Sequence, residues 1–208
     1  MRAFIYTGGD IIKEKIPESP LEEDLIIAAD SGYQNAQAMG VQPQILLGDF
    51  DSLDRNTDIP KEVEIIQVPA EKDLTDTQLA VSLALERGAT ELILIGGLDG
   101  RLDHTLSNLA ILEDLDQKHI RAIFNNGQNR ARFLRDNGVL LLRDSFRYFS
   151  IIAADPIVKG VTVDGCKYPL KKSKLSRTNQ YAVSNEIVGN CALIEIKKGG
   201  VWIIESND

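Results

Sequence analysis

The chain has 208 residues, 43% of them hydrophobic, and a formal net charge of −8. This composition is ordinary for a globular protein and excludes collagen-like, disordered and coiled-coil chains. The acidic balance argues against a nucleic-acid-binding protein, because phosphates attract basic surfaces. Every apolar run is shorter than the roughly 20 residues that span a bilayer. Asp10 and Lys13 come too early for a signal peptide, and two distant cysteines predict no disulfide framework. We therefore expect a cytoplasmic protein that binds neither nucleic acid nor membrane.

Apolar runs alternate with helical patterns through the first 125 residues. The runs lack polar alternation, which is typical of parallel strands that are covered on both faces. The predicted strands are residues 3–6, 25–29, 45–47, 63–68, 92–95 and 121–124. Strands that alternate with helices predict an α/β layer with right-handed crossovers.

Three helices are predicted between these strands. The first spans residues 31–39, the second follows Thr75 and runs to residue 87, and the third follows Asp103. Thr75 and Gln78 fit a capping box at the start of the second helix. The residues expected to face the core are Leu79, Ala80, Leu83 and Ala84 in the second helix, and Leu106, Leu109 and Ala110 in the third.

After residue 125 the pattern changes to short β segments separated by turn signals. The segments are residues 139–142, 148–153, 160–163, 181–184, 191–196 and 201–204. We expect a small antiparallel β-sandwich here, with residues 167–177 as a basic, solvated stretch. The predicted fold is therefore a Rossmann-like, mostly parallel sheet with helices on both faces (residues 1–130), followed by the sandwich (residues 131–208).

Acidic residues cluster directly after predicted strands or at helix starts. They are Asp30, Asp49, Asp51, Asp73, Asp76, Asp99 and Asp103. In an open parallel sheet, ligands bind outside the carboxyl ends of the strands. We therefore expect carboxylates from at least three strands to meet at the same edge.

The Asp49-Phe50-Asp51 segment places two carboxylates on one side of an extended backbone. Two oxygen ligands suit Mg²⁺, which keeps several waters and takes other ligands from substrate phosphates. A single Asp-x-Asp is more often a plain turn. If Asp49 and Asp51 lie close to Asp30 and Asp76, a metal site is favoured over a plain turn, because clustered carboxylates repel one another unless a cation neutralises them.

Phosphate-binding signals are individually weak. The chain has neither a Walker-type loop nor a Gly-x-Gly-x-x-Gly fingerprint. Paired glycines after two strands, at residues 8–9 and 96–97, allow close approach of backbone amides to a phosphate, although such pairs more often form tight turns. Arg101 and Lys72 supply cations that singly are more often surface ion-pair partners. His104 starts a helix and is either structural or a base.

In the second half, Ser184 and Asn185 follow a predicted strand, where a plain turn or an Asx cap is the simpler interpretation. Trp202, the only tryptophan, lies in the last predicted strand. By default it packs in a core or an interface, and at a site it would stack on an aromatic or cationic ring.

These residues, in this order, make the sequence resemble the thiamine pyrophosphokinase (thiamine diphosphokinase) family over nearly its whole length. The motifs are residues 29–32 (ADSG), 48–52 (GDFDS), 72–76 (KDLTD), 96–104 (GGLDGRLDH) and 184–186 (SNE). The resemblance implies an α/β domain with a C-terminal β-sandwich, in a homodimer whose sites lie at the subunit interface. It also implies transfer of a diphosphoryl group from ATP to thiamine, which gives thiamine diphosphate and AMP.

The resemblance further implies roles for individual residues. Asp49, Asp51 and Asp76 hold Mg²⁺, and Asp49, Asp51, Asp73, Asp76 and Arg101 are catalytic. The nucleotide contacts are Asp30, Ser31, Lys72, Thr75, Gly96, Gly97, Arg101, Asp103 and His104. The thiamine contacts are Asp76, Ser184, Asn185 and Trp202. One departure is that residues 176–183 contain no glycine, where the family pattern has glycines before Ser-Asn.

Two other functions are compatible with the residues alone. A metal-dependent phosphohydrolase would use the same carboxylates with water as the acceptor. A regulatory module would bind a nucleotide or thiamine without turnover, although binding alone does not need so many clustered carboxylates. Assays with and without thiamine distinguish the phosphohydrolase from a transferase. Binding of a nucleotide or thiamine without AMP production would indicate the regulatory module.

Overall fold

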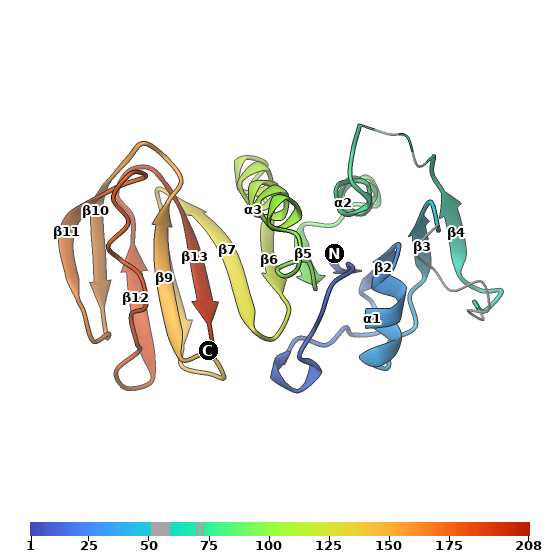
Figure 1. Ribbon diagram of the computed structural model, residues 1–208, viewed down its shortest axis with the longest axis horizontal. Coiled ribbons are helices and arrows are strands. Elements are labelled where there is room, and N and C mark those ends of the chain that lie inside the picture. The colour runs from blue at the N-terminus through green and yellow to red at the C-terminus, as the bar shows by residue number, and fades with distance from the viewer. Residues whose placement is uncertain (51–58, 70, 72) are drawn as a thin grey trace. The chain divides into compact units, whose positions relative to one another are not determined.

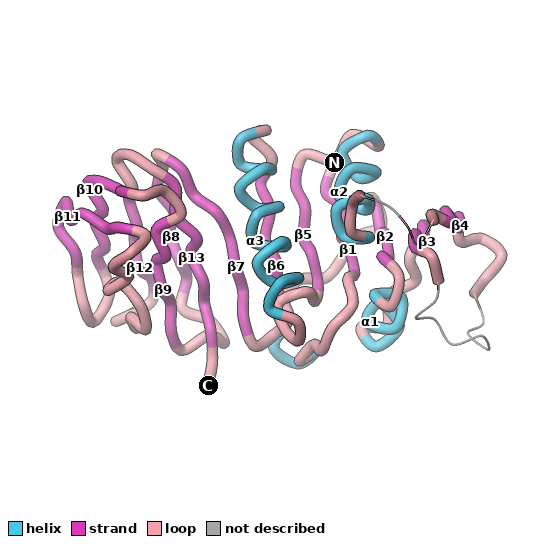
Figure 2. The backbone as a smooth tube through the Cα atoms, turned by 45° about the horizontal axis from the view of Figure 1, so that its top comes forward, coloured by secondary structure: helices cyan, strands magenta, loops and turns pink. Residues whose placement is uncertain are grey.

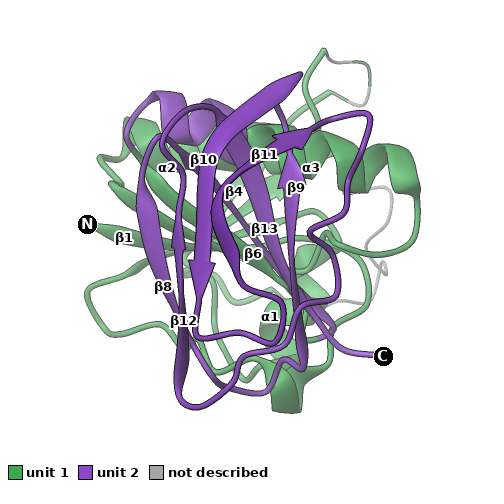
Figure 3. Cartoon of the chain, turned by 90° about the vertical axis from the view of Figure 1, so that its left-hand side faces the viewer, with its two compact units in different colours: residues 1–111, 120–127 green, residues 112–119, 128–208 purple. Residues whose placement is uncertain are grey.

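The computed structural model describes residues 1–50, 59–69, 71 and 73–208. The chain forms two compact units, which Figure 3 shows in separate colours. Unit 1 comprises residues 1–111 and 120–127, and unit 2 comprises residues 112–119 and 128–208. Within the described residues, no helix is long and apolar enough to cross a membrane.

Unit 1 is built on parallel strands in the order β4-β3-β2-β1-β5-β6 (Figure 1). The strands are β1 (Arg2–Tyr6), β2 (Leu25–Ala29), β3 (Ile45–Gly48), β4 (Glu64–Gln67), β5 (Glu91–Ile95) and β6 (Arg121–Asn125). All six predicted strands are confirmed to within a few residues. The strand order reverses between β1 and β5, which makes the carboxyl ends of these two strands the expected place for a ligand.

Helices cover both faces of this sheet, as predicted. They are the short 3-10 helix η1 (Lys13–Lys15), α1 (Gly32–Ala38), α2 (Asp76–Glu86) and α3 (Leu102–Gln117). Tyr33 and Ala36 of α1 pack in one buried cluster with Phe4 of β1 and Leu46 of β3. Figure 1 shows α2 on the opposite side of the sheet from α1, and Figure 2 shows the same elements from another angle.

The predicted capping box at the start of α2 is confirmed. Gln78 N donates to Thr75 Oγ1 at 3.2 Å, and Thr75 N donates to Gln78 Oε1 at 2.9 Å. The predicted core stripe of α2 is only partly right. Ala80 and Ala84 are buried, but Leu79 and Leu83 remain half-buried and Val81 is buried in addition.

The predicted inward face of α3 is largely wrong. Leu106 and Ala110 are exposed and Leu109 is half-buried, and the helix begins one residue before Asp103. The buried residues are Asn108, Ile111, Leu112 and Leu115. Leucines recur on more than one face of this helix, so hydrophobic periodicity alone did not fix its orientation.

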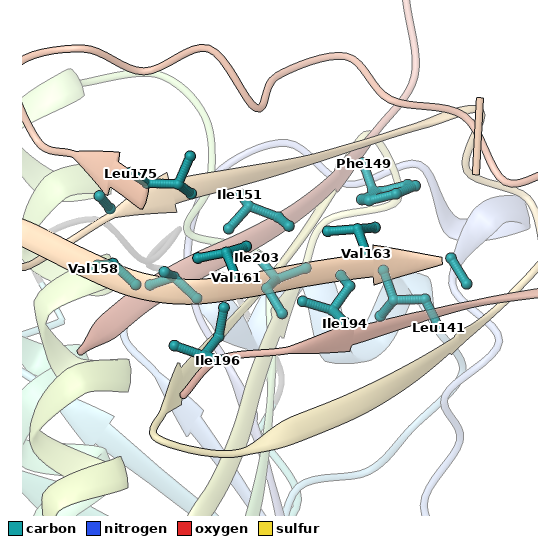
Figure 4. Close-up of a cluster of buried hydrophobic side chains, with 13 residues drawn as sticks. Leu141, Phe149, Ile151, Val158, Val161, Val163, Leu175, Ile194, Ile196 and Ile203 are labelled. Atoms are coloured by element: carbon teal, nitrogen blue, oxygen red, sulfur yellow. The ribbon is translucent and has the colours of Figure 1, made fainter. Parts of the chain in front are cut away.

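Unit 2 is the predicted antiparallel β-sandwich. Its strands are β7 (Asn129–Arg135), β8 (Gly138–Leu142), β9 (Tyr148–Ala153), β10 (Ile157–Asp164), β11 (Leu170–Ser176), β12 (Cys191–Glu195) and β13 (Gly200–Ser206). Within unit 2, β7-β13-β9 form one layer and β11-β10-β12-β8 the other. Ile151 and Ile203 from the first layer pack against Val161 and Ile194 from the second, as Figure 4 shows.

Three details of unit 2 differ from the sequence analysis. Strand β7 lies in a region for which no strand was predicted, and β11 lies in the stretch interpreted as a basic, solvated face. Residues 181–184 are not a strand. They run along the edge of β9, where Ile151 N donates to Ala182 O at 2.8 Å. Just before them, the Gln180 side chain pairs with both N and O of Ala153 at 3.0 and 3.2 Å.

Candidate active site

A cavity of about 530 Å³ lies at the carboxyl ends of the unit 1 strands, at the point where the strand order reverses. Its walls come from the loops after β1, β2, β3 and β5 and from the first turns of α2 and α3. The lining residues are Thr7, Gly8, Gly9, Ala29, Asp30, Ser31, Asp49, Asp73, Leu74, Thr75, Asp76, Thr77, Gly97, Asp99, Gly100, Arg101, His104 and Asn108. Segments far apart in the sequence therefore share one polar cavity.

Most residues predicted for the nucleotide and metal sites line this cavity. They are Asp30, Ser31, Asp49, Asp73, Thr75, Asp76, Gly97, Arg101 and His104. Gly96 and Asp103 do not line it, but each is adjacent in sequence to a residue that does. Asp51 and Lys72 lie outside the described residues. The expectation that carboxylates from at least three strands meet at one edge is confirmed, since Asp30, Asp49 and Asp99 follow β2, β3 and β5 and line this cavity.

The close approach of β2 and β3 explains how these two carboxylates come together. Asp30 N donates to Leu47 O at 2.7 Å, and Asp30 adopts a left-handed backbone with φ of 49°. A Cβ on Gly48 would lie only 3.1 Å from Asp30 Cα, so glycine lets the two strand ends pack closely. Asp49 follows directly after this contact.

The carboxylates of the cavity fit Mg²⁺ only as part of its ligand set. Among the described residues, no three His, Cys, Asp or Glu side chains are grouped closely enough to hold a metal by themselves. Asp30, Asp49, Asp73 and Asp76 nevertheless share the cavity. Magnesium usually binds through one or two carboxylates, with waters and substrate phosphates as its other ligands. The donor set therefore suits a metal that arrives with a phosphate ligand.

Arg101 provides a cation at the cavity, and it is already paired. Its Nη2 lies 2.6 Å from Asp103 Oδ2, and the two side chains are 73% and 63% exposed. The hydrogen bond from Arg101 lowers the pKa of the Asp103 carboxyl below its usual value. An exposed pair of this kind contributes little to stability, so Arg101 can exchange Asp103 for a phosphate at small cost.

One polar residue that shapes the cavity was not predicted from the sequence. Asn108, on α3, is 6% exposed, and its Nδ2 donates to Gly97 O at 2.8 Å. The bond fixes the turn after β5, where Gly97 has a φ of 71°. A buried asparagine on the inner face of a helix was the available signal, and the wrong orientation assigned to α3 hid it.

In unit 2, Ser184 and Asn185 lie beside β9. The Asn185 side chain is 8% exposed and ties two segments together, since its Oδ1 accepts from Tyr168 N and Glu186 N and its Nδ2 donates to Tyr168 O at 2.9 Å. Ser184 is exposed and adopts a φ of 54°. Thus Asn185 anchors this turn and Ser184 presents its side chain to the surface.

Trp202 lies on the face of its sheet that points away from the sandwich core. It is half-buried and meets Phe133 edge-on, with ring centroids 5.9 Å apart. Its partner on β9 is Ile152, which is two residues away from Ser150. The Oγ of Ser150 accepts a hydrogen bond from Ser184 N at 3.0 Å. Because alternate residues of a strand share a face, Ser150 and Trp202 belong to the same face.

The missing glycines before Ser184 have a structural explanation. None of residues 176–183 has a positive φ, so this segment needs no glycine for its backbone conformation. The left-handed position falls on Ser184 itself. The departure from the family pattern is therefore compatible with an ordered turn before Asn185.

Comparisons with known proteins agree with this arrangement. Residues 20–124 match the thiamin pyrophosphokinase catalytic domain, and residues 139–201 match the thiamin pyrophosphokinase vitamin B1 binding domain. Thiamine pyrophosphokinase from Bacillus subtilis is 29% identical over 191 residues, which cover 90% of this chain and 89% of that protein. Thiamin pyrophosphokinase 1 from Caenorhabditis elegans is 25% identical over 78% of this chain and 70% of its own.

Solved structures give the same result. The crystal structure of the Bacillus subtilis enzyme matches with a TM-score of 0.85 and 26% identity, and covers all of both chains. That of the Geobacillus thermodenitrificans enzyme matches with a TM-score of 0.84 and 28% identity over 100% of this chain and 98% of the other. The chain therefore belongs to the thiamin pyrophosphokinase family and forms thiamine diphosphate and AMP from thiamine and ATP.

Proposed function

We propose that the unit 1 cavity binds the triphosphate of ATP together with Mg²⁺, held by Asp49, Asp51 and Asp76. The observation that carries this proposal is the convergence of Asp30, Asp49 and Asp76 on one cavity at the reversal point of the sheet. The proposed nucleotide contacts are Asp30, Ser31, Lys72, Thr75, Gly96, Gly97, Arg101, Asp103 and His104. When bound there, Mg²⁺ would neutralise charge on the phosphate oxygens.

The reaction forms a bond between the hydroxyethyl oxygen of thiamine and the β-phosphorus of ATP. The bond from that phosphorus to the oxygen that AMP retains breaks, and the thiamine hydroxyl loses its proton. Asp73 and Asp76 lie in the cavity at the start of α2, and we assign one of these two carboxylates to orient this hydroxyl and accept its proton. Arg101 binds phosphate oxygens whose negative charge increases as AMP departs.

We propose that the thiamine-binding residues of unit 2 are Ser184, Asn185 and Trp202, and that Asp76 is the thiamine-binding residue of unit 1. An acidic site suits the cationic thiazolium ring. The contacts of Asn185 support an indirect role, in which it positions Ser184, because its side chain already binds two backbone segments. Trp202 supplies an aromatic ring that is half-buried.

The remaining proposals concern organisation. Residues 1–130 are assigned to ATP and Mg²⁺, and residues 131–208 to thiamine and dimerisation. The matches to a catalytic domain over residues 20–124 and to a vitamin B1 binding domain over residues 139–201 support this division. We further propose a cytoplasmic homodimer that binds ATP and thiamine and neither nucleic acid nor membrane.

The direct test is to incubate the protein with ATP, Mg²⁺ and thiamine and to separate the products by chromatography. Thiamine diphosphate and AMP should appear in equal amounts, and AMP should not form when thiamine is omitted. Addition of a chelator should stop product formation, and Mg²⁺ should restore it. Release of phosphate or diphosphate without thiamine would contradict the proposed transfer.

A further inference from the structure

The loop that follows β1, residues 7–10, forms a wall of the cavity and is held by residues to which no role has been assigned so far. One of them is Asn35, on α1. Its Nδ2 donates to Thr7 O at 2.7 Å and to Gly9 O at 2.9 Å. Both hydrogens of this amide group are therefore used to fix two carbonyls of the loop.

Two further backbone groups of the loop are fixed from the turn after β5. Gly8 O accepts from Gly97 N at 3.1 Å. Asp10 N donates to Asp99 Oδ2 at 2.7 Å. The peptide that joins residues 9 and 10 is thus held at its carbonyl by Asn35 and at its N–H by Asp99. The loop is attached both to α1 and to the neighbouring strand's turn.

These contacts determine where the unused donors lie. In a trans peptide the N–H points opposite to the C=O. The carbonyls of Thr7 and Gly8 are directed to protein partners, so the N–H groups of Gly8 and Gly9 point away from those partners. Within the described chain neither N–H makes a hydrogen bond, and both residues line the cavity. Two adjacent backbone donors are therefore available at the cavity wall.

Glycine fits both positions closely. A Cβ on Gly8 would collide with Ser31 Oγ, and a Cβ on Gly9 would collide with Asp99 Oδ1. Gly9 also has a φ of 97°, which disfavours other residues. Asp99 Oδ1 is buried and, among the described residues, has no hydrogen-bond partner, so this oxygen is not presented to an incoming anion.

We infer that the N–H groups of Gly8 and Gly9 bind phosphate oxygens of ATP, and that Asn35 and Asp99 are positioning residues that hold this loop in place. The inference rests on the proposed nucleotide site. Backbone donors that are fixed before the ligand arrives need no reorganisation on binding. Unused amides at a turn after a central strand favour anions.

The test uses Asn35→Asp, which keeps the size but replaces the donor with an oxygen that repels both carbonyls, and Asp99→Ala, which removes the acceptor for Asp10 N. Each should weaken calorimetric binding of a non-hydrolysable ATP analogue with Mg²⁺ by about tenfold or more, the effect of losing one hydrogen bond to a charged group. Inhibition by adenosine and the KM for thiamine should change less than about twofold, because adenosine lacks the phosphates.

Two variants complete the design. Asp99→Asn retains an oxygen acceptor and should restore analogue affinity to within about threefold of wild type. Glu64→Gln removes an exposed pair with Arg87 and should leave every constant unchanged. Thermal unfolding confirms that each variant is folded, and Asp99→Ala tests the inference alone if Asn35→Asp does not fold.

Two results would overturn the inference. One is a folded Asp99→Ala or Asn35→Asp protein with unchanged analogue affinity, and the other is an equal loss of affinity for the analogue and for adenosine. If analogue affinity is unchanged in those variants while Asp76→Asn abolishes AMP formation, only the loop inference is rejected. If all three leave analogue binding intact, the proposed nucleotide site itself is wrong.

Discussion

Each unit contains several arginine–carboxylate pairs, and one pair from each unit shows a clear difference in burial. In unit 1, Arg101 and Asp103 are 73% and 63% exposed. In unit 2, Arg130 and Glu205 are 9% and 3% exposed and lie 2.6 Å apart. Burial opposes the charged form of Arg130, but its hydrogen bonds and attraction to Glu205 outweigh that effect and raise its pKa. The exposed pair can exchange partners with a ligand, whereas the buried pair is fixed in the fold.

The same contrast extends to the residues proposed for the two substrates. The carboxylates of unit 1 line a cavity, whereas the Asn185 amide of unit 2 is largely used in binding backbone groups. Substitutions in the cavity should therefore change activity more than stability, and substitutions in the unit 2 contacts should change stability. Substitutions in both units test this distinction.

The largest effect is expected for Asp76→Asn in the cavity. Removal of a charge that holds Mg²⁺ and orients the thiamine hydroxyl should lower the rate of AMP formation by about a thousandfold, or about 4 kcal/mol. Asp51→Asn should act in the same way. The melting temperature should stay within about 2 °C of wild type. Turnover at the wild-type rate in either variant would contradict the assignment of the cavity.

The next largest effect is expected for Glu205→Gln. It removes the main partner of the buried Arg130, a change that costs about 3–5 kcal/mol in comparable pairs. Asp144 also lies 2.6 Å from Arg130 and compensates in part, so we expect about 3 kcal/mol in urea unfolding. The matched control is Glu186→Gln, which breaks an exposed pair with Lys167. A similar loss in both variants would remove the distinction between buried and exposed pairs.

The third prediction separates Asn185 from its neighbour Ser184. Asn185→Ala leaves the N–H of Tyr168 without its acceptor and should lower the free energy of unfolding by about 2 kcal/mol. Ser184→Ala should change stability by less than about 0.5 kcal/mol and raise the KM for thiamine. Chemical unfolding of both variants measures the change in stability, and steady-state kinetics measures the KM for thiamine. A stable Asn185→Ala protein would show that the amide is not an anchor.

A smaller effect is expected for Arg101→Ala. The exposed pair contributes at most about 1 kcal/mol to stability, so the variant should unfold like wild type. Loss of a charged donor to phosphate should raise the KM for ATP about tenfold. Arg101→Lys should recover only part of this, because lysine lacks the planar fork of donors. An ATP KM that does not change would place Arg101 outside the nucleotide site.

The smallest effect concerns pH. The side-chain hydrogen bond from Arg2 lowers the pKa of the buried Asp24 carboxyl. A lowered pKa in the folded state stabilises the protein above the unfolded pKa of about 3.9, and this stability is lost as the pH falls through the folded-state pKa. Asp24→Asn should therefore be less stable at pH 7 and lose less stability between about pH 5 and pH 2. If the free energy of unfolding depends on pH in the same way in wild type and Asp24→Asn, this linkage is contradicted.

The unit 1 strands and the capping box of α2 were predictable because their signals are local. Continuous apolar runs mark strands covered on both faces, and Thr75 and Gln78 are three residues apart. The acidic cavity was predictable for the same reason, since each carboxylate directly follows a strand or starts a helix. The general rule for open parallel sheets then places them together.

The elements that were missed depend on partners distant in sequence. Strand β7 was not predicted because Arg130 and Arg132 alternate with apolar residues. Their shared partner is Glu205, which is 75 residues away from Arg130. Strand β11 is an edge strand, and edge strands often carry lysines that prevent pairing with other chains. The helical face of α3 depends on packing that hydrophobic periodicity did not specify.

The loop of residues 7–10 was the least predictable part of the cavity. Its paired glycines were visible in the sequence, but a pair of glycines after a strand is usually a tight turn. The contacts that give the loop its proposed role come from Asn35, which is 26 residues away from Gly9, and from Asp99, which is 89 residues away from Asp10. Sequence spacing does not reveal such contacts.

The central claim is that the acidic cavity of unit 1 holds the triphosphate of ATP. The most direct measurement is a crystal structure of the protein with Mg²⁺ and a non-hydrolysable ATP analogue. We expect a metal bound by Asp49 or Asp76 and phosphate oxygens within hydrogen-bond distance of Gly8 N, Gly9 N or Arg101. A triphosphate bound elsewhere, with this cavity filled only by water, would contradict the account.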